Sequence, residues 1–352
     1  MEDVPLAEIL SVVPEWSPAN EPAIALRGGY SHQVYALGRR HVLRMAPPER
    51  AHRLRHEALI LADLAGRVDL HAFRHVLPRV VGEFNVSELD RRPEFGSRGE
   101  WRGLVVNRFP GANAFRSWLD ASPPVRRDWV RQAATILRAV HGVCAPIEGR
   151  SAPPSRGDGF VVGWYATRIE CAGFDWRAAH RDYLARLQAR LATAHVARHR
   201  VLVEASLAAC EARLDAMVTQ IGPRPGHGDF HLHNIVVSGA TVTGLIDWEW
   251  GGMTEPDADL AHLLRWSLFP SHPADEDLEH CVSPRDFSEV PSAVWDAYPE
   301  IARVACLEER LFVYLVEHDL HQLVGFPDST QATERLEAWH SGAVREVMPR
   351  GA

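Results

Sequence analysis

Two short segments near the middle of the chain constrain its fold most strongly. The first runs from His227 to Asn234 with the sequence HGDFHLHN, and the second, IDWE, places Asp247 thirteen residues after Asn234. Magnesium-dependent phosphoryl transfer needs one carboxylate to orient the acceptor hydroxyl, and an asparagine and an aspartate to hold the metal ion on the nucleotide phosphates. Asp229, Asn234 and Asp247 supply these three groups at a suitable spacing.

The residues between the two segments predict how the chain returns. β-Branched runs at residues 235–237 and 241–246 flank a Ser-Gly-Ala turn, which is typical of a two-stranded hairpin. Such a hairpin would bring Asp247 back beside Asn234. In kinase-like folds a tight catalytic loop holds the base and the metal-binding asparagine five positions apart, which is the separation of Asp229 and Asn234.

These residues resemble the aminoglycoside phosphotransferase family, whose relatives include choline kinases, fructosamine kinases and several antibiotic kinases. The family pattern reads H-G-D-[LF]-H-x-x-N followed by I-D-[WF]-E, and residues 251–261 (GGMTEPDADLA) are similar to its continuation. The resemblance implies that Asp229 is catalytic, that Asn234 and Asp247 hold Mg²⁺, and that ATP or GTP is the phosphoryl donor. We expect Asp259 to cap or brace the catalytic loop from a following helix, because an acid suits a helix start.

The implied fold is α+β and protein-kinase-like, with two lobes, in agreement with a length of 352 residues, which exceeds the usual limit for one core. A small N-terminal lobe at residues 1–109 would contain an antiparallel sheet and bind the nucleotide. A mainly helical C-terminal lobe at residues 110–352 would carry catalysis, with a helical substrate-binding insertion at about residues 150–222. Leucines at helical spacing predict an αα-hairpin there.

An alternating pattern supports a competing interpretation. On a strand, His227, Asp229, His231 and His233 would point to one side, as the ligands of metal-dependent hydrolases do. That site would leave Asn234 and the IDWE segment without roles, so we interpret His227 as a structural loop residue. A metal-dependent hydrolase and an inactive nucleotide-binding module stay open as alternatives.

The N-terminal region supplies an independent test of a kinase-like small lobe. Residues 26–35 (LRGGYSHQVY) are similar to the family's phosphate-binding hairpin, in which Gly28, Gly29 and Ser31 would approach the nucleotide. His32 stands where the family pattern has asparagine.

A cationic residue follows in a predicted strand at residues 41–45. Arg44 occupies the place of the protein-kinase lysine. The sequence contains no lysine, and its 38 basic residues other than histidine are all arginine. Arginine stays charged when buried and binds phosphate through a planar fork. We expect Glu57, in a predicted helix at residues 53–64, to be its ion-pair partner; the alternative is a solvated acid on the helix surface.

The strand at residues 101–109 and the following Pro110-Gly111 look like the family's hinge between lobes. Backbone groups around Asn107 and Arg108 would then hydrogen-bond the purine, which does not separate ATP from GTP. Apolar spacing predicts a buried helix at residues 130–141.

Acceptor contacts are assigned to aromatic residues of the insertion and to the end of the IDWE segment. Such rings could floor a pocket for a ring-shaped ligand or could simply pack in the core. Glu249 either reaches the outer shell of the metal ion or stabilises the loop. The candidate substrate-binding residues are Trp164, Tyr165, Trp176, Glu249 and Trp250.

Charge gives divided evidence on the acceptor. A polycationic aminoglycoside requires an acidic cleft. Residues 177–220 carry seven arginines against four acids, whereas residues 255–289 carry nine acids against two arginines. We expect a less cationic hydroxyl compound, such as a nucleoside-type or peptide antibiotic, or else a metabolite of the choline, sugar or amino-sugar type.

Composition limits the other partners. A formal charge of −8 disfavours general nucleic-acid binding. No run of eighteen apolar residues is present and the N-terminus is acidic, so we expect a cytoplasmic protein with no membrane partner. The five scattered cysteines lack CxxC spacing, which argues against a disulfide framework or structural zinc. A monomer and a homodimer are both compatible with the sequence.

Overall fold

The computed structural model describes residues 6–26, 32–86, 100–143, 175–193, 197–222, 224–272 and 278–349. Its internal contacts divide the chain into two compact units. Unit 1 comprises Met1–Ala114 and His233–Trp250, and unit 2 comprises Phe115–Leu232 and Gly251–Ala352. The lobe boundary between residues 109 and 110 and the insertion at residues 150–222 stay predictions. Among the described helices, none combines the length and the apolar character needed to cross a membrane.

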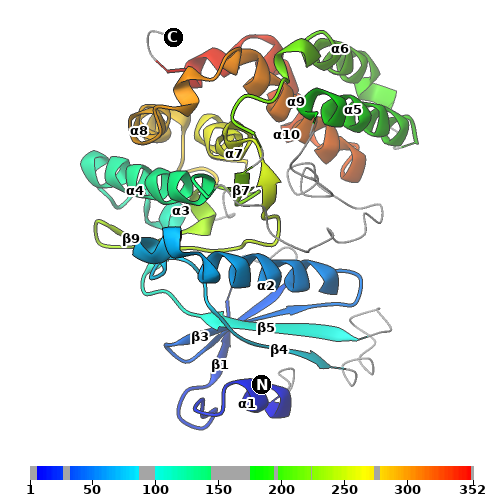
Figure 1. Ribbon diagram of the computed structural model, residues 1–352. Coiled ribbons are helices and arrows are strands. Elements are labelled where there is room, and N and C mark those ends of the chain that lie inside the picture. The colour runs from blue at the N-terminus through cyan, green and yellow to red at the C-terminus, as the bar shows by residue number, and fades with distance from the viewer. Residues whose placement is uncertain are drawn as a thin grey trace. The chain divides into compact units, whose positions relative to one another are not determined.

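A five-stranded antiparallel sheet forms the centre of unit 1 (Figure 1), with strand order β1-β2-β3-β5-β4. Its strands are β1 (Ala23–Ala25), β2 (Gln33–Leu37), β3 (His41–Ala46), β4 (Val80–Val86) and β5 (Trp101–Asn107). Three helices belong to the same unit: α1 (Leu6–Val12), α2 (Ala51–Gly66) and the 3-10 helix η1 (Val68–Phe73). In Figure 1, α1 and α2 lie on opposite sides of the sheet.

The two faces of this sheet have different tasks because successive residues of a strand point to opposite sides. Leu43 and Met45 of β3 are fully buried in a core cluster that includes Ile9 of α1 and Trp16. Arg44, between them, contacts α2 instead. The alternation of β3 therefore puts hydrophobic packing on one face of the sheet and the cationic group of Arg44 on the other.

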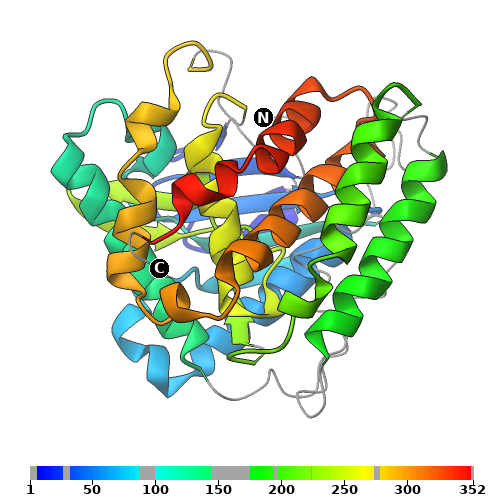
Figure 2. The same cartoon turned by 90° about the horizontal axis from the view of Figure 1, so that it is seen from above.

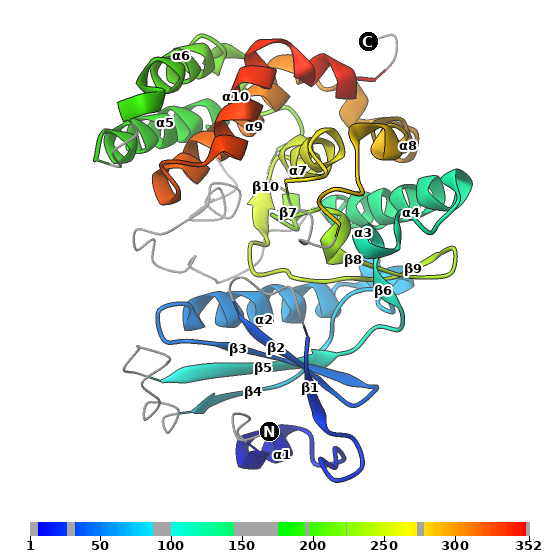
Figure 3. The same ribbon diagram turned by 180° about the vertical axis from the view of Figure 1, so that it is seen from behind.

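The predicted hairpin after Asn234 is present. Strand β8 (Ile235–Ser238) pairs antiparallel with β9 (Thr241–Leu245), and β6 (Ala112–Asn113) completes a three-stranded sheet, visible in Figure 3. Gly239 in the turn has φ of 57°, a left-handed conformation that costs glycine little. The 3-10 helix η7 (Leu232–Asn234) leads into β8.

Unit 2 is mainly helical. Figure 2 shows its long helices packed side by side, and α9 contacts α5, α6, α7 and α10. The predicted helical pair is present as α5 and α6, and the helix expected at residues 130–141 is the C-terminal part of α4. The α-helices are α3 (Ala114–Ser117, which begins at the end of unit 1), α4 (Pro123–His141), α5 (Trp176–Thr193), α6 (Arg200–Glu211), α7 (Pro256–Leu268), α8 (Val290–Ala297), α9 (Leu307–Gly325) and α10 (Thr330–His340).

Short elements connect these helices. Strands β7 (Arg224–Gly226) and β10 (Gly252–Thr254) form a two-stranded antiparallel sheet that begins just before the catalytic motif and ends just before α7. The 3-10 helices are η5 (Ala197–His199), η6 (Leu214–Ala216), η8 (Pro284–Phe287), η9 (Ile301–Arg303) and η10 (Ala343–Val347).

Unit 2 buries charged side chains in pairs. Arg310 is fully buried and donates two hydrogen bonds to Asp257, at 2.6 and 3.0 Å. Asp319 accepts from Arg265 at 2.7 Å and from Arg335 at 2.8 Å. A buried charge is strongly destabilising without its partner. These pairs therefore tie α7 and α10 to α9.

Candidate functional site

The loop that carries Asp229 begins where β7 ends. His227 and Gly228 donate their backbone N–H groups to the two carboxylate oxygens of Asp259, at 2.6 and 2.7 Å. Asp259 is fully buried in the first turn of α7 and also contacts Nε2 of His141 at 3.1 Å. Burial alone raises the pKa of Asp259, but the hydrogen bonds and charge of His141 and His227 hold it below 3.8. The predicted brace on the catalytic loop is confirmed.

Asp229 lies between two imidazoles. Nε2 of His231 is 3.2 Å from Oδ2 of Asp229, and Nδ1 of His262 is 3.3 Å from Oδ1. Burial raises the pKa of the Asp229 carboxyl, but the charges and hydrogen bonds of both histidines hold it well below 3.8. The side chain keeps 26% of its surface exposed. It is therefore an ionised carboxylate that can accept a hydrogen bond from a ligand.

The alternating histidines do not lie on a strand. Strand β7 ends at Gly226, and η7 begins at Leu232, so the alternation does not put the four side chains on one side. His227 is fully buried and its Nδ1 accepts a hydrogen bond from the Asp229 N–H at 3.3 Å, as expected of a structural loop residue. No group of three or more His, Cys, Asp or Glu side chains is placed to hold a metal ion within the described residues.

Arg44 is the centre of the polar cluster in unit 1. Its Nη1 donates to both carboxylate oxygens of Glu57, at 2.6 and 2.5 Å, so the predicted ion pair is present. Its Nη2 donates to Oδ1 of Asp247 at 2.7 Å. The two acids raise the pKa of Arg44 against the opposing effect of burial. A fixed cation and the carboxylate of the IDWE segment are thus in direct contact.

Backbone hydrogen bonds hold the segment around Asp247 beside Asn234 and Glu57. The N–H of Ile246 donates to the Asn234 carbonyl at 2.9 Å, and the N–H of Trp248 donates to Glu57 at 3.1 Å. Asp247 has φ of 69°, a left-handed conformation that is uncommon outside glycine, asparagine and aspartate. The Asp247 side chain is 34% exposed. One carboxylate and one amide oxygen, completed by phosphate oxygens and water, make a donor set that suits Mg²⁺.

Glu249 and Trp250 continue this cluster. Oε2 of Glu249 is 3.3 Å from Nδ1 of His32, and Oε1 is 4.0 Å from Arg53, whose guanidinium lies 4.3 Å from the centre of the Trp250 ring. His32 Nδ1 is also 3.2 Å from Nη2 of Arg44. Glu249 is buried, so these contacts support its predicted role in stabilising the segment that carries Asp247.

Burial and mutual repulsion shift the pKa values of the acids around Arg44. Burial, followed by the charge of Asp247, raises the pKa of Glu249 to about 8. Burial also raises the pKa of Glu57 to about 7, because the opposing charge of Arg44 offsets only part of its effect. Burial and the charge of Arg44 lower the pKa of His32 to about 2, so its ring is neutral.

The backbone N–H groups of Asn107 and Arg108, in the predicted hinge, already have partners. The Asn107 N–H donates to the Arg79 carbonyl at 3.1 Å, and the Arg108 N–H donates to the Arg40 carbonyl at 2.7 Å. Both N–H groups therefore donate to backbone carbonyls of residues that precede the neighbouring strands β4 and β3. The Asn107 side chain is also engaged, since its Oδ1 accepts from the Arg79 N–H. The N–H groups of these two residues are therefore not free to read a purine.

Several predicted contacts lie outside the described residues, namely Gly28, Gly29, Ser31, Trp164 and Tyr165. Trp176 is described: it begins α5, is fully buried, and donates from Nε1 to the Tyr314 hydroxyl at 3.0 Å. This position corresponds to core packing, the alternative that the sequence left open for the aromatic residues.

Three acids around the start of α7 are structural. Glu255 accepts from the backbone N–H of Gly222 at 3.0 Å, Asp257 pairs with Arg310, and Asp259 braces the catalytic loop. All three are fully buried. The acidic count for residues 255–289 therefore overstates the negative charge that a cationic acceptor could meet.

Sequence reasoning missed His262. It lies three residues after Asp259, which is one helical turn, so both side chains lie on the same side of α7. The segment that resembles the family pattern ends at Ala261. Helical spacing from Asp259 was the signal that could have found it.

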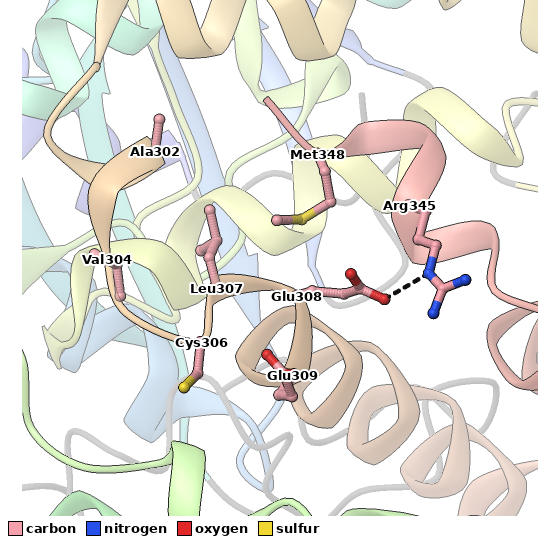
Figure 4. Close-up of a pocket in the computed structure, with 8 residues that line it drawn as sticks. All are labelled: Ala302, Val304, Cys306, Leu307, Glu308, Glu309, Arg345 and Met348. Atoms are coloured by element: carbon pink, nitrogen blue, oxygen red, sulfur yellow. Dashed lines mark hydrogen bonds and ion pairs between the residues drawn. The ribbon is translucent and has the colours of Figure 1, made fainter. Parts of the chain in front are cut away.

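A pocket of about 430 Å³ opens elsewhere in unit 2, at the N-terminal end of α9 (Figure 4). An ion pair of 2.8 Å between Arg345 and Glu308 lies among its lining residues. None of the predicted site residues lines it. It belongs to the packing of the C-terminal elements.

Comparison with known proteins supplies the family. The model of the phosphotransferase enzyme family matches residues 23–282. A search of curated proteins found no match. Family membership confirms the prediction that this chain is a phosphotransferase.

Solved structures supply the fold. A thermostable mutant of aminoglycoside phosphotransferase APH(4)-Ia, with AMP-PNP and hygromycin B, is 13% identical with a TM-score of 0.60 and covers 94% of this chain and 95% of its own. ADP-bound aminoglycoside phosphotransferase APH(2'')-Ib is 12% identical, with a TM-score of 0.55 and coverages of 96% and 99%. Amicoumacin kinase hAmiN, with AMP-PNP, Ca²⁺ and Ami, is 13% identical, with a TM-score of 0.55 and coverages of 95% and 91%.

Identities this low show the fold alone, and they confirm the predicted α+β, protein-kinase-like class. The family model covers most of the chain, including Arg44, Asp229 and Asp247. The chain therefore belongs to the phosphotransferase enzyme family.

Proposed function

We propose that this enzyme transfers the γ-phosphoryl group of ATP to a hydroxyl group of a small molecule, and that the acceptor is an antibiotic. The observation that carries the proposal is the Arg44 contact set. One guanidinium is held by Glu57 and touches Asp247, which is the arrangement that phosphoryl transfer enzymes use to bring phosphate and metal together.

Three side chains have distinct roles in this proposal. Asp229 orients the acceptor hydroxyl, since it is ionised and partly exposed. Its depressed pKa makes it a weak proton acceptor, which suits a transition state in which positioning matters more than early proton removal. Asn234 and Asp247 would hold Mg²⁺. That ion would supply stabilisation of the charge that develops on the transferring phosphoryl group.

The nucleotide is held through charge and through the main chain. Arg44 would bind the inner phosphates with its planar fork. The relatives compared above were solved with ADP and AMP-PNP, which supports ATP as the donor here. With the Asn107 and Arg108 N–H groups engaged, the next donor along the chain, the Phe109 N–H, is our candidate for the purine. We also propose a cytoplasmic location, which the use of ATP as donor would favour.

The acceptor class is supported by the relatives and limited by the buried acids. Hygromycin B and Ami are bound in the solved relatives. The engagement of Glu255, Asp257 and Asp259 in structural contacts favours an acceptor of low positive charge. A metabolite kinase acting on a sugar-, amino-sugar- or choline-like compound is the second candidate, because the same site would serve it.

A transfer assay tests the proposal. The enzyme would be incubated with γ-labelled ATP or GTP, Mg²⁺ and a panel of antibiotics and metabolites that carry hydroxyl groups. We expect labelled product from an antibiotic, and its loss in both Asp229→Ala and Asp229→Asn. Asp296→Asn, which changes an exposed acid paired with Arg127, is the matched control and should keep full activity.

Other outcomes separate the alternatives. Transfer to metabolites alone would select the metabolite kinase. Nucleotide binding without transfer to any acceptor would indicate an inactive nucleotide-binding module. Zinc-dependent hydrolysis that survives Asp247→Ala would support the metal-dependent hydrolase and overturn the proposal.

A further inference from the structure

The carboxylate of Asp229 is contacted by two imidazoles through opposite ring nitrogens. His231 approaches Oδ2 through Nε2, and His262 approaches Oδ1 through Nδ1. These contacts engage both oxygens of the carboxylate, each of which has two lone pairs. Two donors on different oxygens also prevent rotation of the carboxylate about its bond to Cβ.

Both rings are themselves held in place. His231 is stacked on Trp266, with ring centroids 4.3 Å apart and planes inclined by 17°. His262 meets His318 of α9 edge to face, with centroids 4.9 Å apart. The two histidines that contact Asp229, His231 and His262, are each 7% exposed. Packing therefore restricts each ring to the orientation in which it contacts Asp229.

Helix α7 supplies two of the groups that fix the catalytic loop. Asp259 binds the backbone N–H groups of His227 and Gly228, and His262, one turn later, reaches the side chain of Asp229. Trp266, one further turn along, supports His231. One face of α7 thus sets both the backbone of the loop and the orientation of its carboxylate.

The surroundings of His262 indicate its tautomer. A neutral imidazole donates from only one nitrogen. Nε2 of His262 is buried and has no hydrogen-bond partner among the described residues. The form protonated at Nδ1 donates to Asp229 and leaves no buried N–H unpaired. The form protonated at Nε2 could not donate to Asp229 and would leave a buried N–H without a partner.

We propose that His262 is a positioning residue, which donates from Nδ1 to Asp229 and, together with His231, holds the carboxylate in the orientation that receives the acceptor hydroxyl. The role of the orientation rests on the proposed function. The hydrogen bond itself is a property of the free enzyme and can be measured without any acceptor.

Amide isosteres test the geometry. Asparagine places its amide nitrogen where histidine carries Nδ1, and glutamine places it where histidine carries Nε2. His262→Asn should therefore keep kcat within about threefold, whereas His262→Gln and His262→Ala should lower it by about 10- to 100-fold with KM little changed. The pattern should reverse at His231, where the contact uses Nε2, so that His231→Gln is the milder change.

His272 provides the matched control. It follows the C-terminal end of α7, is partly buried, and contacts Arg335 through Nδ1 at 2.5 Å, away from Asp229. His272→Asn should leave kcat unchanged. Thermal unfolding of every variant identifies any that fails to fold.

Nitrogen-15 NMR of histidine-labelled wild-type enzyme keeps the test independent of the variants and of the acceptor. We expect the His262 ring to be protonated at Nδ1 in the free enzyme. A ring protonated at Nε2 alone, an unchanged kcat in folded His262→Ala, or equal losses in the Asn and Gln variants would overturn the inference. Absence of transfer by the wild type would instead refute the proposed function, while the NMR result would still decide the hydrogen bond.

Discussion

Nη2 of Arg44 lies 2.7 Å from Oδ1 of Asp247, while Nη1 of the same guanidinium binds both oxygens of Glu57. Phosphate would compete with Asp247 for Arg44, and a metal ion would compete with Arg44 for Asp247. In the proposed function, nucleotide binding would therefore exchange one ion pair for two interactions with the ligand. Glu57 would keep the guanidinium in place during this exchange.

Replacement of Arg44 should affect nucleotide binding and stability separately. A lysine keeps the charge but cannot form the planar fork, so we expect Arg44→Lys to raise the KM for ATP by roughly tenfold. Arg44→Met leaves Glu57 buried without its partner and should lower the free energy of unfolding by about 3–5 kcal/mol. Steady-state kinetics and urea unfolding measure the two effects.

Arg67 offers a control for that experiment. It pairs with Asp63 at 2.8 Å, four residues earlier along the chain, and lies outside the Arg44 contact set. Arg67→Lys should leave the KM for ATP unchanged. An Arg44→Lys enzyme with a normal KM would contradict the assignment of Arg44 to the phosphates.

Removal of either proposed metal ligand should change the response to magnesium. Asp247→Asn loses the charged ligand and Asn234→Ala loses the amide oxygen, so both should raise the Mg²⁺ concentration for half-maximal activity, by about tenfold or more. Titration of activity with MgCl₂ at saturating ATP measures this value. Asp63→Asn is the control, and an unaltered magnesium response in both site variants would remove them from the metal site.

Asp259 should link stability to catalysis. Asparagine at this position has one acceptor oxygen in place of two, so it cannot serve both the His227 and Gly228 N–H groups as Asp259 does. We expect Asp259→Asn to lower the free energy of unfolding by about 1–3 kcal/mol and to reduce kcat. Asp286 is the comparison, since it caps η8 through Ser283. Asp286→Asn should destabilise the enzyme without changing kcat, and a similar result for Asp259→Asn would argue against a brace on the catalytic loop.

The sequence predicted those features of the site that depend on spacing along one segment. The separation of Asp229 from Asn234, the hairpin of β8 and β9 and the Arg44–Glu57 pair follow from local geometry or from a position in a strand and the next helix. The role of Asp259 was also accessible, because an acid in the first turn of a helix is well suited to accept from backbone N–H groups.

Features that depend on the packing of distant segments were not predictable. His262 contacts Asp229 because α7 packs against the loop, and Trp176 is buried because Tyr314 of α9 lies beside it. The hinge assignment stays a prediction. Sequence alone does not reveal that the Asn107 and Arg108 N–H groups are engaged by backbone carbonyls, because that depends on pairing with distant segments. Charge counting failed for the acids of α7, because sequence does not reveal which carboxylates are buried with partners.

A buried histidine in α9 should make stability depend on pH. His321 is 6% exposed, its Nδ1 is 3.0 Å from the Tyr183 hydroxyl, and burial followed by the charge of Arg190 lowers its pKa from 6.5 to about 4. The unfolded chain then binds more protons than the folded enzyme between these pH values, so stability falls as the pH drops from about 6.5 to 4.

The difference between 6.5 and about 4, at 1.36 kcal/mol for each pH unit, corresponds to at most roughly 3 kcal/mol. Other buried histidines contribute in the same direction, so the comparison must be made with His321→Asn, which keeps a polar group beside Tyr183. Urea unfolding at several pH values should show that the variant gains stability relative to the wild type as the pH falls. Parallel curves for the two proteins would mean that folding does not change the pKa of His321, which would contradict the prediction.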